Sequence, residues 1–364
     1  MGNYYFKNNI EIEDFRYVFL CGVSLNFREK SKDKREILSC FIQSEDENAR
    51  PIILEKNFLT RSSKRNRNIA YSDAGFSNLY QVEMLVNYLS DINFIILESI
   101  STGAEAGMFL GEPKAQEKTC LLIPDEMAIE ENKLGAFLKF SFEHSNVSIM
   151  TFYPQIKPYK LSDNISGWYT FFNNNLVGKY LGDDITKFIS DKTSRHLIGF
   201  STSRESLSEG KIFYKIDEER LVIEICPRTL MICVGALLSC EEYSSDFFSN
   251  TGHTIQEIES TVVSWLQTTF INSIAEIDGQ KAKNCNIKID ANMDDLGPNR
   301  AIGMIIYLFK AAELITIKKM KDYEDTKKVR FGKKMLTIGG IKNRFFYNKY
   351  DDCIERMVEK KIIV

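Results

Sequence analysis

Short apolar runs alternate with helical patterns along about the first 150 residues of the chain. The runs have the length and the β-branched and aromatic content of buried strands, and they cover residues 17–20, 51–54, 93–97, 118–124 and 147–152. Amphipathic spacing predicts helices at residues 33–42, 77–90 and 125–140, and another from near Thr102 onward. Strands that alternate with helices favour a parallel sheet with right-handed crossovers. We therefore expect an α/β fold with a doubly wound, mainly five-stranded parallel sheet.

The alternation stops after residue 153. Residues 154–167 carry the Pro, Gly and polar side chains of a linker. A β-hairpin is expected over residues 211–225 and helices over 253–274 and 298–314, while the apolar run 228–240 fits either type of element. Residues 327–338 predict a basic hairpin that turns at Gly332. We therefore expect a mixed α+β C-terminal region, which ends either in a winged-helix module or in a packed subdomain with a solvated hairpin.

Composition places the chain among ordinary globular proteins, with 44% apolar and 27% charged residues in 364. Such a length predicts two or three domains. There is neither an apolar run of about 20 residues nor a signal-peptide core at the start, so we expect a cytoplasmic protein without membrane segments. The eight cysteines form no C-x-x-C pair, which indicates packing residues and neither a zinc site nor a disulfide framework.

Charge is distributed unevenly, although the net charge is only −3. Residues 310–364 hold fifteen Lys or Arg against eight Asp or Glu, so this end is +7 and the remainder is −10. We expect the basic hairpin to contact nucleic acid or a partner through Lys327, Lys328, Lys333 and Lys334. A second basic segment around Lys64 follows the predicted strand 51–54, where phosphate binding and a solvated surface loop are equal alternatives.

Two carboxylates meet where the predicted strand 93–97 passes into the next helix. Glu98 ends the strand, and Glu105 lies in the expected first turn of the helix between Gly103 and Gly107. In open parallel sheets, ligands bind beyond the carboxyl ends of the strands. We therefore take this corner, residues 93–109, as the candidate active site.

The same residues also fit a purely structural pattern. Thr102-Gly-Ala-Glu105 matches the capping box, in which Thr102 would accept the N–H of Glu105 and the Glu105 carboxylate would accept the N–H of Thr102. In this alternative Glu105 caps a helix and has no chemical role.

Three segments carry a resemblance to a known superfamily: Val18-Phe-Leu-Cys-Gly22, Leu89-Ser-Asp91 before a strand, and the run from Glu98 to Gly107. They resemble the nucleoside 2-deoxyribosyltransferase-like superfamily, in which a strand-end acid and a helix-start glutamate share the site. Within it, the seven-residue spacing from Glu98 to Glu105 is similar to that of the effector proteins of bacterial retrons. The resemblance covers residues 17–124, about a third of the chain.

The resemblance implies an N-glycosidase. Cleavage of an N-glycosidic bond develops positive charge on the ribose, which the carboxylate of Glu105 would stabilise or attack. Glu98 would accept hydrogen bonds from the sugar hydroxyls. The other expected substrate-binding residues flank the corner or could supply a proton, and they are Cys21, Gly22, Ser99, Ser101, Thr102, Gly103, Tyr71 and Asp73.

NAD is the favoured substrate, and no cofactor or metal is expected. Nicotinamide in NAD is already cationic and leaves without a strong general acid, whereas a purine must usually be protonated. The histidines, His144, His196 and His253, all lie outside the predicted strand ends.

The resemblance further implies a toxin-like effector that depletes a nucleotide in abortive defence against phage. Its partners would be a retron reverse transcriptase and an RNA–DNA hybrid, and homo-oligomers are plausible. The expected domains are a catalytic domain over 1–153, a middle α+β region over 154–250 and a C-terminal contact domain over 251–364. The alternatives are a non-enzymatic nucleotide sensor with Glu105 as a helix cap and, third, a salvage deoxyribosyltransferase.

Overall fold

The computed structural model describes residues 4–23, 33–57, 69–124, 146–152, 172–173, 176–192, 195–245, 247–248, 252–293, 296–320, 327–333 and 352–360. The chain forms two compact units, each assembled from separate stretches of sequence. The sheet unit comprises Arg16–Lys56 and Ser90–Thr193, and the mixed unit comprises Met1–Phe15, Asn57–Leu89 and Ser194–Val364. The domain limits expected from sequence stay a prediction.

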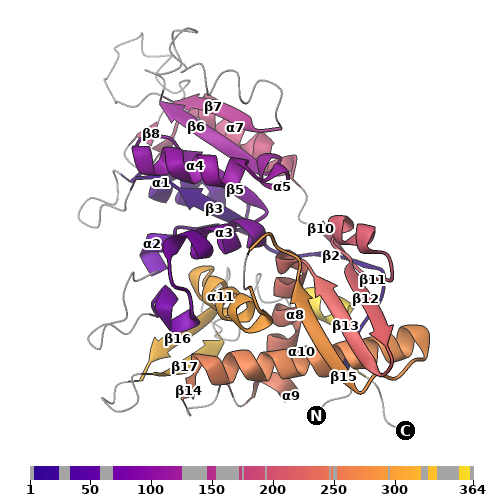
Figure 1. Ribbon diagram of the computed structural model, residues 1–364. Helices are drawn as coiled ribbons and strands as arrows, with labels where there is room; N and C mark the ends of the chain where they lie inside the picture. The colour runs from indigo at the N-terminus through magenta and orange to yellow at the C-terminus, as the bar shows by residue number, and fades with distance from the viewer. Residues whose placement is uncertain are drawn as a thin grey trace, which may run out of the picture. The chain divides into compact units, whose positions relative to one another are not determined.

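The sheet unit is an α/β structure with one five-stranded, all-parallel sheet (Figure 1). The sheet strands are β3 (Arg16–Cys21), β4 (Ala49–Ile52), β5 (Ile92–Ile96), β6 (Thr119–Pro124) and β7 (Ser148–Phe152). Its other elements are α1 (Lys34–Glu45), α2 (Leu54–Asn57), α4 (Ile100–Leu110), α5 (Pro113–Gln116), α7 (Lys179–Ser190) and the short pair β8 (Phe172–Asn173) and β9 (Leu176–Val177).

The strand order β4-β3-β5-β6-β7 creates a topological switch point between β3 and β5. The chain passes from β3 outward to β4 and then crosses back over β3 to β5, after which the strands follow in sequence order. In sheets of this order the crevice at the carboxyl ends of the two strands at the reversal is the usual ligand site. The switch point therefore directs attention to the ends of β3 and β5.

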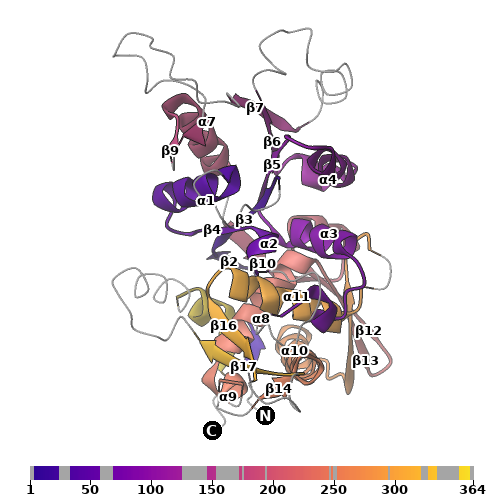
Figure 2. The ribbon, with the colours of Figure 1, turned by 90° about the vertical axis from the view of Figure 1, so that its left-hand side faces the viewer.

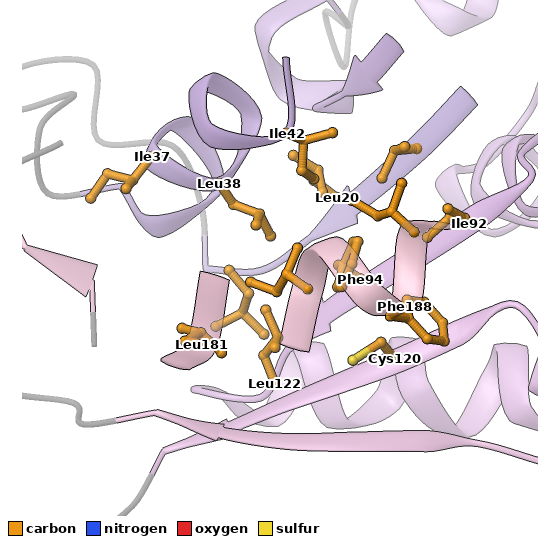
Figure 3. Packing of buried hydrophobic residues seen from close by; sticks show 14 of the residues in the cluster. Leu20, Ile37, Leu38, Ile42, Ile92, Phe94, Cys120, Leu122, Leu181 and Phe188 are labelled. Atoms are coloured by element: carbon orange, nitrogen blue, oxygen red, sulfur yellow. The ribbon is translucent and has the colours of Figure 1, made fainter. Parts of the chain in front are cut away.

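Helices cover both faces of the sheet, with α1 and α7 on one face and α4 on the other (Figure 2). On the first face, β3, β5 and β6 contribute Val18, Leu20, Phe94 and Leu122, which pack against α1 and α7 (Figure 3). On the other, the rings of Phe19 and Phe109 lie 5.8 Å apart. Burial on both faces explains why these strands are continuous apolar runs rather than alternating ones.

Most elements predicted for this unit are confirmed. The strand predicted at 51–54 begins two residues earlier, because Leu54 already starts α2. Pro51 is accommodated because β4 is the edge strand, where a missing N–H leaves no gap in a ladder. The predicted helix 125–140, the linker 154–167 and the basic loop around Lys64 lie outside the described residues.

The mixed unit contains several small sheets and four longer helices among its described residues. The helices are α3 (Leu79–Leu89), α8 (Pro227–Ser239), α10 (Ile255–Asp278) and α11 (Pro298–Ala311), with the short η2 (Tyr71–Ala74), η4 (Arg204–Glu209) and α9 (Glu241–Ser244). Its strands are β1 (Tyr4–Phe6), β2 (Ile10–Glu13), β10 (Arg195–Ile198), β11 (Phe200–Ser201), β12 (Ile212–Asp217), β13 (Arg220–Ile225), β14 (His253–Thr254), β15 (Asn284–Ile289), β16 (Ile315–Lys319), β17 (Lys328–Lys333) and β18 (Val358–Lys360).

The predicted hairpin is confirmed as the antiparallel pair β12 and β13, which belongs to the sheet β11-β12-β13-β15 (Figure 1). The undetermined run 228–240 is helix α8, which carries a proline in its first turn and is buried on nearly all sides. All-round burial removes the periodicity by which a helix is recognised.

The predicted turn of the basic hairpin at Gly332 is wrong. Gly332 lies inside β17 and pairs with Thr316 of β16, while the other edge of β17 pairs with β14. The antiparallel pair is formed by β16 and β17. In the part of the chain that the structure describes, no helix is both long and apolar enough to cross a membrane.

Candidate active site

The candidate corner lies at the carboxyl end of β5, next to the switch point. β5 ends at Ile96, and the chain passes through Leu97 and Glu98 into α4, which begins at Ile100. Ser99 is the N-cap in an extended conformation, and its side chain accepts the N–H of Thr102 at 3.2 Å. The Thr102 hydroxyl oxygen accepts the N–H of Ser99 at 3.0 Å. The strand end and the first turn of the helix are therefore locked together.

This geometry overturns the alternative in which Thr102 and Glu105 form a capping box. The box is formed one turn earlier by Ser99 and Thr102, so Glu105 lies in the second turn and caps nothing. Thr102 is completely buried in this role. Helix capping therefore does not explain the presence of a glutamate at position 105.

Glu98 forms an ion pair with Lys34 of α1. Both side chains are about one-fifth exposed, and the Lys34 ammonium also lies 5.3 Å from the centre of the Phe152 ring at the end of β7. A partly buried carboxylate whose partner has a second contact of its own is held in place more firmly than an exposed ion pair. Glu98 is therefore a fixed charge at the carboxyl edge of the sheet.

Arg35 is the most completely enclosed charge of the corner, with a side chain that is 2% exposed. Its guanidinium donates to both carboxylate oxygens of Asp33, at 3.3 and 3.2 Å, and to Glu55 at 2.8 Å. It also reaches the carbonyl oxygen of Gly22, the residue after β3, at 3.4 Å. A side chain at Gly22 would collide with Arg35, because an added Cβ would lie 2.9 Å from its Cδ. Glycine is required here by close approach.

Glu105 is half-buried beside this network, and its pKa is raised to about 7. Burial is the largest cause, the negative charge of Glu55 adds to it, and the positive charge of Arg35 opposes both. Among the described residues the Glu105 carboxylate has no hydrogen-bond or ion-pair partner. A carboxylate without a partner beside a buried network, at a ligand-binding edge, is a functional candidate on physical grounds.

The other predicted site residues divide into three groups. Gly22 and Ser99 belong to the corner, Ser101 and Gly103 are exposed on α4, and Cys21 is buried at the end of β3. Tyr71 and Asp73 belong to the mixed unit, where Asp73 pairs with Lys319 at 2.8 Å and accepts the N–H of Ala70. Of the four predicted contact lysines, Lys327 is exposed, Lys328 and Lys333 lie in β17, and Lys334 is outside the described residues.

The sequence pattern did not single out Arg35 or Glu55. Arg35 stands on the buried face of α1 with Leu38 and Ile42. An arginine at a position where the helical pattern calls for an apolar residue could have indicated a buried charged network. Glu55 follows the end of β4 as Glu98 follows β5, so the rule that selected Glu98 also applies to it.

The arrangement is suited to a positively charged reacting group. The described residues at the carboxyl edge include two cations, Lys34 and Arg35, and four carboxylates, which are Asp33, Glu55, Glu98 and Glu105. Within the described residues no cluster of three or more His, Cys, Asp or Glu side chains could hold a metal ion. All eight cysteines are free thiols.

Comparison with known protein families gave one informative result. The family model described as STM3845 retron effector protein matches residues 31–227, more than half of the chain. The matched range contains all four carboxylates of the corner together with Lys34 and Arg35, and it ends before the basic C-terminal region. A search among curated proteins found no match.

Proposed function

The chain belongs to the STM3845 retron effector protein family, and from this premise we propose that it is an N-glycosidase whose catalytic carboxylate is Glu105. The family implies a role in retron-mediated defence and association with a retron system. One observation carries the proposed activity: Glu105, half-buried and without a partner among the described residues, stands at the carboxyl edge of a parallel sheet beside the switch point.

The proposed reaction breaks the bond between C1′ of a ribose and the nitrogen of a base. The bonding electron pair leaves with the base, and positive charge develops on the sugar. The ionised Glu105 carboxylate stabilises that charge or adds to C1′ as an ester. Water then attacks C1′, which releases Glu105 where it had added, and supplies the hydroxyl that replaces the base, while its other proton passes to solvent. Glu98, fixed by Lys34, accepts hydrogen bonds from the sugar hydroxyls and orients the ring.

NAD is the substrate that the corner supports best. Its nicotinamide ring carries a positive charge and leaves as a neutral base, so no proton has to be delivered. Among the described residues of the corner, carboxylates outnumber cations by four to two, which favours a cationic ribosyl group over a neutral nucleoside. Depletion of NAD would stop an infected cell, which is consistent with a defence role.

Control of such an activity requires partners. We expect a reverse transcriptase and its RNA–DNA hybrid to restrain the enzyme until infection. The basic region from Lys310 onward, with Lys327 exposed, is the surface proposed for nucleic-acid contact.

The test is to incubate the purified protein with NAD and, separately, with deoxynucleosides, and to separate released base by chromatography. We expect nicotinamide from wild type and a loss of at least 100-fold in rate for Glu105→Gln, the order of effect seen when a charge-stabilising group is removed. Glu45→Gln is the matched control, because Glu45 is exposed at the far end of α1. Tight binding of a nucleotide without release would favour the sensor instead, and release that survives Glu105→Gln would refute the assignment.

A further inference from the structure

A further carboxylate of the corner, Glu55, has no role in the mechanism above. It lies on α2, directly after β4, and its side chain is 45% exposed. One of its oxygens, Oε1, accepts a hydrogen bond from Arg35 at 2.8 Å. β4 and β5 flank β3 on either side, so residues that follow these strands face the same edge of the sheet. Glu55 and Glu105 therefore approach the switch point from its two sides.

Arg35 is anchored independently of Glu55. Asp33 is 7% exposed and accepts from the Arg35 guanidinium through both oxygens, and the Gly22 carbonyl accepts as well. The arginine stem passes so close to Gly22 that no Cβ would fit there without displacing it. Arg35 is thus a rigid support, and among its described partners Glu55 is the one that is substantially exposed.

Among the described residues, the charged groups that act on Glu105 are Glu55 from α2 and Arg35 from α1. Arg35 is shared between Asp33 and Glu55, so its positive charge is largely compensated before it acts on Glu105. Glu98 has its own cation in Lys34. The negative charge of Glu55 therefore acts on Glu105 without full compensation. Because like charges repel, it disfavours ionisation of the Glu105 carboxyl group.

We propose that Glu55 is a second functional carboxylate of the site, held by Arg35 so that it and Glu105 face the same developing positive charge. The inference rests on the proposed function and deepens it. In the empty site the two negative charges repel each other. When the C1′–N bond breaks and the electron pair leaves with the base, the cationic sugar relieves that repulsion, so the pair stabilises the transition state more than the ground state.

The direct test follows Glu105 itself. Glutamate labelled with ¹³C at the side-chain carboxyl is incorporated into the full chain, and the Glu105 signal is assigned by its loss in Glu105→Gln. In wild type this signal should titrate with a midpoint near 7. Glu55→Gln should lower the midpoint by on the order of one pH unit, because a like charge is removed. Glu45→Gln, the same chemical change at an exposed site, should leave it in place.

Kinetics supply the second readout. Base release should rise with pH as Glu105 ionises, and Glu55→Gln should move this rise to lower pH while reducing the maximal rate about tenfold. A Glu105 midpoint that is the same in Glu55→Gln as in Glu45→Gln would overturn the inference. The NMR titration decides this whether or not a base is released, so a wild-type protein that releases none would refute the proposed function alone.

Discussion

Gly22→Ala tests the packing that supports the corner. An added Cβ would lie 2.9 Å from Cδ and 3.0 Å from Cγ of Arg35, whereas carbon atoms in contact are about 3.5–4.0 Å apart. The arginine cannot swing aside cheaply, because its backbone is in α1 and its guanidinium is held by Asp33 and Glu55. Overpacking of this kind costs about 1–3 kcal/mol. In a unit of this size, that corresponds to a melting temperature lower by roughly 2–12 °C.

Gly107→Ala is the matched substitution with the opposite expected sign. Gly107 lies inside α4, and nothing comes within 4 Å of a Cβ built there. Alanine should therefore stabilise the helix by about 0.5–1 kcal/mol.

Hydrogen exchange of the amides in β3 and α1 measures the local stability of the sheet unit independently of the mixed unit. We expect faster exchange in Gly22→Ala and unchanged or slower exchange in Gly107→Ala. Equal protection in the two variants would refute the proposed crowding around Arg35.

Two further predictions concern the mixed unit. Burial raises the pKa of Glu259 from its ordinary 4.5 to about 8, so between these pH values the folded protein holds a proton that the unfolded chain has lost. The free energy of unfolding should therefore fall as pH rises from 4.5 to 8, by about 5 kcal/mol in total. Thermal unfolding from pH 5 to pH 9 should show this slope in wild type and a shallower one in Glu259→Gln, and equal slopes would contradict the buried, protonated carboxyl. Replacing Lys327, Lys328, Lys333 and Lys334 with Gln should weaken binding of an RNA–DNA hybrid and reduce the slope of log binding constant against log salt concentration by up to about 4, whereas unchanged binding would exclude this surface.

The parallel sheet could be predicted because its signals are local. β3, β5 and β6 are buried on both faces, so each appears as an uninterrupted apolar run, and the intervening α1 has a clear stripe with Asp33 as its N-cap. α8 lacked such a signal because nearly every residue in it is buried. Gly332 was misplaced because a glycine in a basic stretch resembles a turn, although it lies within a paired strand.

The helix cap at the corner could not be chosen from sequence alone. Ser99-x-x-Thr102 and Thr102-x-x-Glu105 overlap, and either could start a helix. The pattern T-x-x-E does form a reciprocal cap at α10, where Thr254 and Glu257 exchange hydrogen bonds of 2.7 and 3.1 Å. At α4 the backbone is already helical from Ile100, so Thr102 lies inside the first turn. The same T-x-x-E pattern therefore forms a helix cap at α10 and not at α4, depending on where the helix begins.

The charged neighbours of Glu105 come from distant parts of the chain, and this explains why they were missed. Arg35 and Glu55 lie 70 and 50 positions before it in the chain, and only the strand order brings the ends of β3, β4 and β5 to one edge. Glu98 and Glu105 could be selected from sequence because ligands bind at the carboxyl ends of parallel strands. The charged network around them could be recognised only from the folded structure.

The most direct test of the account is the rate of nicotinamide release from NAD by Glu105→Gln, measured beside wild type and Glu45→Gln at pH 8. Ionised Glu105 is the species that the mechanism requires, and at this pH it predominates in wild type because its pKa is about 7. The account predicts release by wild type and Glu45→Gln at equal rates, and a rate at least 100-fold lower in Glu105→Gln. Equal rates in all three proteins would contradict it.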